Sequence, residues 1–267
     1  MKILPAIVIV FMLLMAFMSN GVIAQTPTPE PTVLSPGDIA IIGYNSTYSN
    51  NTQDIVILFL TNVNQGTKIS FTDFGWNGSS FVRVINGTPV SDDGVYEWTT
   101  DKSYPTGSSK LIIHNPDDSG SRFNFKAIGD QIFVFQGNYD SSPNLLFGVN
   151  INYTSWQNDV MNSSQSKLPE ILENANLTNL LSNSKYDTNL GITFTSTESA
   201  MIEITKNENW VGHETNRLVY STLPEFKISP TIVKLNNFSN KPQNYYPILI
   251  IVLIFITMAL LRNKNFL

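Results

Sequence analysis

The sequence contains no cysteine among its 267 residues. This absence excludes disulfide bonds, thiol catalysis and cysteine-liganded metals together. Histidine is nearly as scarce, with only His114 and His213, and the His213-Glu214 pair lacks the second histidine of a zinc-protease helix. A Gly-x-Ser-x-Gly elbow and a glycine-rich phosphate loop are also absent from the sequence. The sequence therefore shows no catalytic signature, and we expect no cofactor.

Acidic residues outnumber basic residues in the part of the chain between the two apolar ends. All 21 acidic residues lie between Gln25 and Tyr246, together with 13 of the 16 lysines and arginines, so this part carries a formal charge of 13 − 21 = −8. A surface of this sign repels phosphate backbones and anionic lipid headgroups. Nucleic acid is therefore not an expected partner.

The first 24 residues have the three parts of a signal peptide in order. Lys2 precedes an apolar run from Ile3 to Met18; polar Ser19 and Asn20 follow, and then Val22-Ile23-Ala24, with small residues at the positions that a signal peptidase reads. This pattern predicts export, with cleavage after Ala24. An uncleaved N-terminal anchor is the alternative.

A second apolar run lies near the C-terminus, at residues 245–261. These 17 residues form about 25 Å of helix, the short end of what crosses a hydrocarbon core of about 30 Å. Tyr245 and Tyr246 are the first two residues of this run, and Arg262 and Lys264 follow it, as is typical of an outer and a cytoplasmic border. The sequence predicts a single-pass protein of the cell membrane, with its ectodomain outside the cell. A buried soluble helix and a sorting tail that is later removed are the alternatives.

Two segments near the middle of the chain define the expected core. Ile55–Leu60 is apolar on both alternating sets of side chains, which predicts a central strand buried on two faces. In Lys68–Thr72, apolar residues alternate with Lys68, Ser70 and Thr72, which predicts a strand with one face in water.

Further strand-like runs recur about every 8–15 residues, separated by turns rich in Asn, Gly, Pro and Asp. We expect strands at residues 39–44, 55–61, 68–72, 81–85, 95–99, 110–114, 123–126, 131–135 and 145–150, with later ones at 191–194, 200–205, 218–220 and 226–228. Only Leu168–Leu181 has a helical apolar stripe. This spacing predicts an antiparallel β-sandwich.

The chain thus divides into six predicted parts. They are a signal peptide (1–24), a Thr/Pro-rich linker (25–36), a β-sandwich ectodomain (37–228), a polar stalk (229–244), a transmembrane helix (245–261) and a cytoplasmic tail (262–267).

Several short segments carry a resemblance to a known module. GDIAIIGYNS from Gly37, GTKISFTDFGWNG from Gly66, GDQIFVFQG from Gly129 and ENWVG from Glu208 occur in the order of a module found in secreted and surface proteins of bacteria and archaea. That module is similar in layout to lamin-tail-type domains. The resemblance covers about residues 37–228 and implies an all-β, immunoglobulin-like β-sandwich that serves attachment and has no catalytic residues.

The ectodomain is rich in asparagine and contains eight Asn-x-Ser/Thr sequons. If the host glycosylates exported proteins, they predict N-glycans. The sequons begin at Asn45, Asn50, Asn77, Asn86, Asn152, Asn162, Asn176 and Asn237.

One loop has part of the ligand pattern of a calcium site. Asn115, Asp117 and Ser119 occupy its first, third and fifth places, with Gly120 in the sixth. The twelfth place, where a bidentate Glu sets the affinity, is Lys126. A hairpin turn is the favoured interpretation, and the three residues are weak candidate metal ligands.

Taken together, these features predict a non-catalytic cell-surface protein for binding, adhesion or envelope structure, whose partner is an envelope glycan or a surface protein. The alternative is a polysaccharide hydrolase, which a cleft lined by two or more carboxylates would favour; Glu170 and Glu173 are an acidic pair of the required type. The tryptophans are expected in the core, with Trp156 the one most suited to an exposed platform.

Overall fold

The computed structural model describes residues 29–49, 52–91, 93–115, 122–220 and 222–229. The chain divides into two compact units, Met1–Thr231 and Ile232–Leu267, and all described residues belong to the first. The predicted signal peptide, most of the stalk, the transmembrane helix and the cytoplasmic tail lie outside the described residues. Within those residues, no helix has the length and apolar character needed to cross a membrane.

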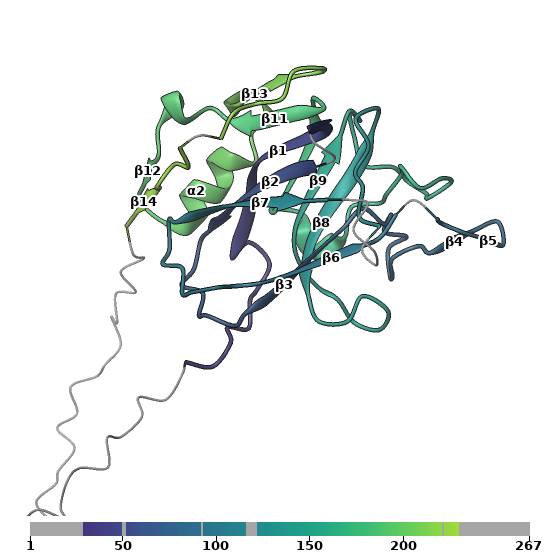
Figure 1. Ribbon diagram of the computed structural model, residues 1–267, viewed down its shortest axis with the longest axis horizontal. Helices are drawn as coiled ribbons and strands as arrows, with labels where there is room; N and C mark the ends of the chain where they lie inside the picture. Colours follow the sequence, from purple (N-terminus) through teal and green to yellow (C-terminus); the bar gives the residue numbers. More distant parts are fainter. Residues whose placement is uncertain (1–28, 50–51, 92, 116–121, 221, 230–267) are drawn as a thin grey trace, which may run out of the picture. The chain divides into compact units, whose positions relative to one another are not determined.

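Two five-stranded sheets make up most of the described chain (Figure 1). The first sheet contains, in spatial order, β13 (Trp210–His213), β11 (Asn183–Tyr186), β1 (Ile39–Ser49), β2 (Thr52–Phe59) and β7 (Ser109–His114). The second contains β10 (Asn176–Leu180), β9 (Asn144–Ile151), β8 (Asp130–Gln136), β3 (Lys68–Thr72) and β6 (Val95–Thr99). All neighbours within these sheets are antiparallel except β9 and β10, which are parallel.

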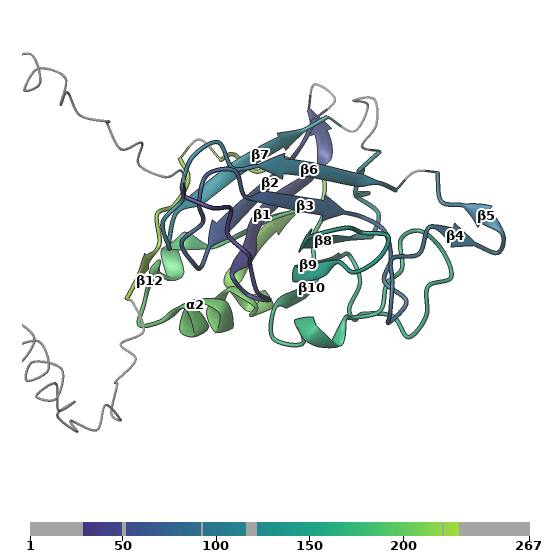
Figure 2. The same ribbon diagram turned by 90° about the horizontal axis from the view of Figure 1, so that it is seen from below.

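Smaller elements surround the two sheets. They are the β4 (Val84–Ile85) and β5 (Thr88–Pro89) hairpin, the β12 (Thr193–Phe194) and β14 (Lys227–Ile228) pair, the helix α2 (Thr197–Ile204), and the 3₁₀ turns η1 (Glu170–Leu172), η2 (Thr188–Leu190) and η3 (Asn207–Asn209). Figure 2 shows the β4–β5 hairpin extending from the side of the sheets opposite to β12 and α2.

The two sheets pack face to face through aromatic and aliphatic side chains. Phe59 of β2 lies 6.4 Å, centroid to centroid, from Trp98 of β6 in the other sheet. Every residue from Ile55 to Leu60 is buried, as predicted, because β2 lies between β1 and β7 in one sheet and also faces the second sheet. The predicted strands Lys68–Thr72 and Val95–Thr99 have the bounds observed for β3 and β6.

The predicted wet face of β3 is observed only at Lys68, which is exposed. Ser70 and Thr72 are buried, and the register places them beside Phe135 and Phe133 on the outer face of the second sheet. Phe81 packs on both of these rings, at 5.4 and 5.8 Å between centroids. The segments that follow β3 and β9 thus cover this face with a second aromatic cluster, a long-range contact that strand alternation does not reveal.

Two predicted elements have the opposite secondary structure. The predicted helix Leu168–Leu181 is the short turn η1 followed by β10, in line with the low helix propensity of its asparagines. The predicted strand at 200–205 lies within α2 instead. Ser196 and Ser199 form a reciprocal capping box at its start, and Ala200, Met201 and Ile204 form its buried face. The strands expected at 123–126 and 218–220 are extended coil.

The two-sheet body begins before the predicted boundary at Gly37. Leu34, within the predicted linker, is buried, and its amide N–H donates to Gln136 Oε1 at 2.8 Å. Thr32 donates its N–H to Thr67 Oγ1, also at 2.8 Å. The last residues of the Thr/Pro-rich segment are therefore part of the folded body.

The C-terminal end of the described chain lies across the outer face of the first sheet, and we call residues 217–220 and 222–229 the C-terminal strap. At one end Arg217 donates to Asp54 Oδ2 at 2.5 Å. In the middle the Tyr220 ring lies against Gly43, where an added Cβ would be 2.8 Å from the ring. At the other end Phe226 N–H donates to the Gly107 carbonyl at 2.8 Å. The strap is thus fixed at both ends and along its length.

Candidate functional site

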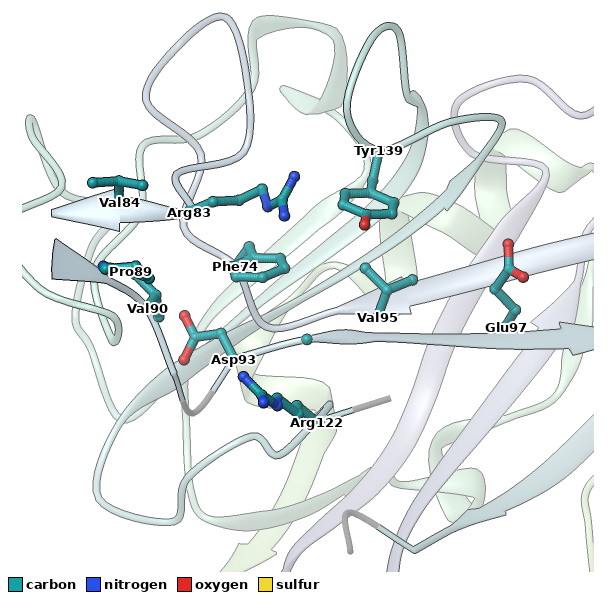
Figure 3. Close-up of a pocket in the computed structure, with 11 residues that line it drawn as sticks. Phe74, Arg83, Val84, Pro89, Val90, Asp93, Val95, Glu97, Arg122 and Tyr139 are labelled. Carbon is teal, nitrogen blue, oxygen red and sulfur yellow. The ribbon is translucent and has the colours of Figure 1, made fainter. Parts of the chain in front are cut away.

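An open cleft of about 720 Å³ lies on the second sheet, and its volume is within the size range of ligand sites. Its wall contains two arginines, two carboxylates and two aromatic rings, and we call it the arginine cleft (Figure 3). The residues that line it are Phe74, Arg83, Val84, Pro89, Val90, Asp93, Gly94, Val95, Glu97, Arg122 and Tyr139.

The β4–β5 hairpin forms one wall of the arginine cleft. Its turn residues Asn86 and Gly87 have φ values of 51° and 81°, the combination that a tight two-residue hairpin turn requires. This turn chemistry was predicted from the Asn-Gly pair. The hairpin presents Val84 and Pro89 to the cleft, opposite Val95 of β6 (Figure 3).

Arg83 is held in place at the cleft by two neighbours. Its guanidinium lies 5.3 Å from the centre of the Tyr139 ring and forms an ion pair with Asp140. About half of each charged side chain is exposed, so this pair adds little stability. Its effect is to keep a planar guanidinium stacked on an aromatic ring at the mouth of the cleft.

The other charged residues of the cleft differ in exposure and pairing. Glu97 is exposed and forms an ion pair with Lys68 at 3.2 Å. Asp93 is almost completely buried in the cleft wall. Arg122 is exposed, points toward Asp93 in Figure 3, and has the positive φ of 48° that is uncommon for a residue with a side chain.

Beneath the cleft, Asp73 joins two parts of its wall. Asp73 Oδ1 accepts from Gly94 N–H at 2.7 Å, and Oδ2 accepts from Asn124 N–H at 2.8 Å, two residues beyond Arg122. The next residue, Phe74, itself lines the cleft. The Asp of the Phe-Thr-Asp segment is therefore a structural support of the site.

Asp130 has a similar role one strand away. Its carboxylate accepts from Lys126 N–H at 2.8 Å and from the backbone and side chain of Gln131 at 2.9 Å each. Burial raises the pKa of both carboxyl groups, that of Asp73 to about 7. The charge of Asp73 raises the pKa of Asp130 further, whereas Lys126 and the backbone donors act in the opposite direction.

The candidate calcium ligands are only partly within the described residues. Asn115 is half-buried, and Asp117 and Ser119 lie outside the described ranges. The nearest acidic residues that could complete a site are engaged elsewhere, Asp130 with backbone N–H groups and Asp140 with Arg83. Among the described residues, no group of three or more His, Asp or Glu side chains is arranged to hold a metal ion.

We expect calcium to leave the stability of the protein unchanged. Three side-chain oxygens fall short of the six to eight that calcium prefers, and Lys126 at the twelfth place donates to Ser163. A site filled at 100 times its dissociation constant would add about 2.7 kcal/mol. Thermal unfolding in chelator and in about 0.1 mM calcium should give the same midpoint; an increase that Asp117→Ala abolishes would establish a metal site.

The predicted sequons fall into three groups in the structure. The exposed ones, which can carry a glycan in the folded state, are Asn77, Asn86 and Asn162. Those whose side-chain amide donates inside the fold are Asn45, Asn152 and Asn176. Those outside the described residues are Asn50 and Asn237. Asn45 is fully buried, so a glycan on it is incompatible with this packing. Glycosylation itself stays a prediction.

The tryptophans and the acidic pair do not form a site of their own. Trp156, the predicted exception, is half-buried like Trp98 and Trp210, and its ring stacks on Phe133 at 5.4 Å. Glu170 and Glu173 flank the exposed side of η1 and are not among the residues that line the described hollows.

The residues of the arginine cleft were not found from the sequence. They come from loops and strand ends between residues 74 and 139, and only the fold brings them together. One signal was available, because arginine is rare in this chain. Comparison with protein families, curated proteins and solved structures found no match.

Proposed function

We propose that this chain is a non-catalytic, cell-surface binding protein that holds a glycan in the arginine cleft. The observation that carries the proposal is the composition of the cleft. It combines aromatic rings, on which a sugar ring can pack, with guanidinium donors and the exposed Glu97 carboxylate as acceptor for its hydroxyl groups. The two other well-formed hollows, of about 540 and 350 Å³, are lined by fewer charged residues.

The position of the C-terminal end of the described chain supports a tethered binding protein. The β12–β14 pair, near this end, lies on the side of the two-sheet body away from the β4–β5 hairpin (Figures 1 and 2). A tether at this end therefore leaves the cleft accessible. In this proposal the signal peptide directs export, the segment at 245–261 spans the cell membrane, and the body is an immunoglobulin-like sandwich of lamin-tail type.

Binding of the full-length protein to a panel of neutral and acidic oligosaccharides tests the function. We expect Tyr139→Ala to weaken binding about tenfold, because packing on an aromatic ring contributes about 0.5–1.5 kcal/mol. Tyr153→Ala is the matched control, since Tyr153 is also partly buried but does not line the cleft. If no oligosaccharide of the panel binds, the proposed function is wrong.

A second candidate, a polysaccharide hydrolase, is favoured by the presence of Asp93 and Glu97 in one cleft. However, residues four apart in an extended chain have Cα atoms about 13 Å apart, and glycosidases place their carboxyl groups about 5–10 Å apart. Glu97 is also paired with Lys68. Release of new reducing ends from a bound polysaccharide, abolished by Glu97→Gln, would support the hydrolase.

The predicted membrane topology has a direct test. A protease added to intact cells should remove the region from Gln25 to Tyr246 and leave a small membrane-bound fragment, because only the C-terminal residues are expected in the cytoplasm. A cytoplasmic protein of the same cells should stay intact as the control. Protection of the ectodomain would reverse the proposed orientation.

A further inference from the structure

Arginine is concentrated at the arginine cleft. The region from Gln25 to Tyr246 contains only three arginines, and two of them, Arg83 and Arg122, line this cleft. The third, Arg217, forms one end of the C-terminal strap and is bonded there to Asp54 and to backbone carbonyls. Both arginines available to a ligand are thus in one place, in a region whose net charge is −8.

The charges of the cleft are not all equally available. Asp140 neutralises Arg83, and Lys68 neutralises Glu97. Arg122 forms no ion pair with any residue that the structure describes. Its side chain is exposed and its residue lines the cleft, so its guanidinium can reach a ligand there.

Guanidinium and carboxylate groups select opposite partners. A guanidinium only donates hydrogen bonds, and its planar fork matches a carboxylate with two parallel bonds. The exposed carboxylate of Glu97 accepts hydrogen bonds, which the hydroxyl groups of a sugar supply, whereas the oxygens of Asp93 are buried in the cleft wall. A ligand that satisfies both sets carries a carboxylate and several hydroxyl groups on one ring.

We propose that the arginine cleft recognises sugars of the uronic acid class, with the sugar carboxylate bound by Arg122 and a neighbouring ring face packed on the Arg83–Tyr139 stack. This inference rests on the proposed function and names the class of glycan. The acidic body opposes the approach of a long polyanion. Short oligouronates are therefore the expected ligands.

The test measures binding of the full-length protein to oligomers of glucuronic, galacturonic and mannuronic acid, each paired with its own methyl ester. The ester keeps the ring and its hydroxyl groups but removes the negative charge. For at least one pair we expect the acid to bind tenfold or more tightly than the ester. Arg122→Gln should remove this difference, whereas Lys102→Gln, the same charge change at an exposed site outside the cleft, should preserve it.

The outcomes separate the two levels of the proposal. Equal affinity for acids and esters overturns the uronate inference and leaves glycan binding in place. If a sulfated oligosaccharide built from neutral sugars binds as tightly as the oligouronate, the cleft selects anions in general, and the assignment to carboxylates is overturned. Absence of binding to any acid, ester or neutral sugar overturns both levels. Should Arg122→Gln shift the thermal midpoint, Arg122→Lys, which keeps the charge but lacks the planar fork, gives a second reading, because it should reduce the same difference.

Discussion

Replacing Ile57 with alanine should lower the free energy of unfolding by about 2–5 kcal/mol. Ile57 is fully buried in β2, with β1 paired on one side and β7 on the other. Removing three methyl or methylene groups there leaves a cavity that the paired backbone cannot collapse to fill. Denaturant unfolding of the wild type and of Ile57→Ala checks this.

Ile128→Ala is the control for this comparison. Ile128 is 89% exposed, so its truncation removes almost no buried area and should change the free energy of unfolding by less than about 0.5 kcal/mol. Similar effects of the two substitutions would contradict the central position of β2.

The free energy of unfolding should be about 2–3 kcal/mol higher at pH 5 than at pH 7, because folding takes up about one proton. Burial raises the pKa of Asp73 to about 7 and also raises that of Asp130, so the folded state holds a proton that the unfolded state releases. The resulting stability is complete below the unfolded pKa of about 3.9 and is lost as the pH rises through the folded value. Thermal midpoints between pH 4 and 8 measure the slope.

Asp73→Asn should flatten this pH dependence. It removes one titrating group and also the charge that raises the pKa of Asp130. It has a cost of its own, about 1 kcal/mol, because one of the two N–H groups bonded to Asp73 then loses its acceptor. Asp159→Asn, at an exposed position, should keep the slope. A wild-type stability that rises from pH 5 to pH 7 would show that the buried pair stays ionised.

Local sequence patterns were sufficient to predict most strands, but not which distant segments cover the faces of each strand. The apolar run at Ile55–Leu60 predicted a doubly buried strand because both alternating sets are apolar, and β2 is such a strand. The alternation in β3 predicted an exposed face, which Phe81 and Trp156 cover from more distant segments. For α2, the decisive signal was the Ser196–Ser199 capping box, which outweighs the β-branched residues that follow.

The arginine cleft was beyond sequence reasoning for a similar reason. Asp73 and Asp130 follow or begin buried strands, where polar turn residues are common, and only the fold shows that they accept hydrogen bonds from backbone N–H groups. Arg83 and Arg122 are 39 positions apart and have no spacing that marks a site. Their rarity pointed to them, but only the fold shows that they share one wall.

The C-terminal strap also determines how the body would respond to tension. A pull on Ser229 first meets the bonds from Ser229 N–H to the Phe194 carbonyl, from Lys227 N–H to the Ile192 carbonyl and from Phe226 N–H to the Gly107 carbonyl. These bonds connect the strap to edges and loops, whereas the buried strands β2 and β8 pair only with strands of their own sheets. Tension on the C-terminus should therefore peel the strap from Ser229 toward Arg217 before it separates the sheets, so that the strap absorbs extension while the arginine cleft keeps its shape.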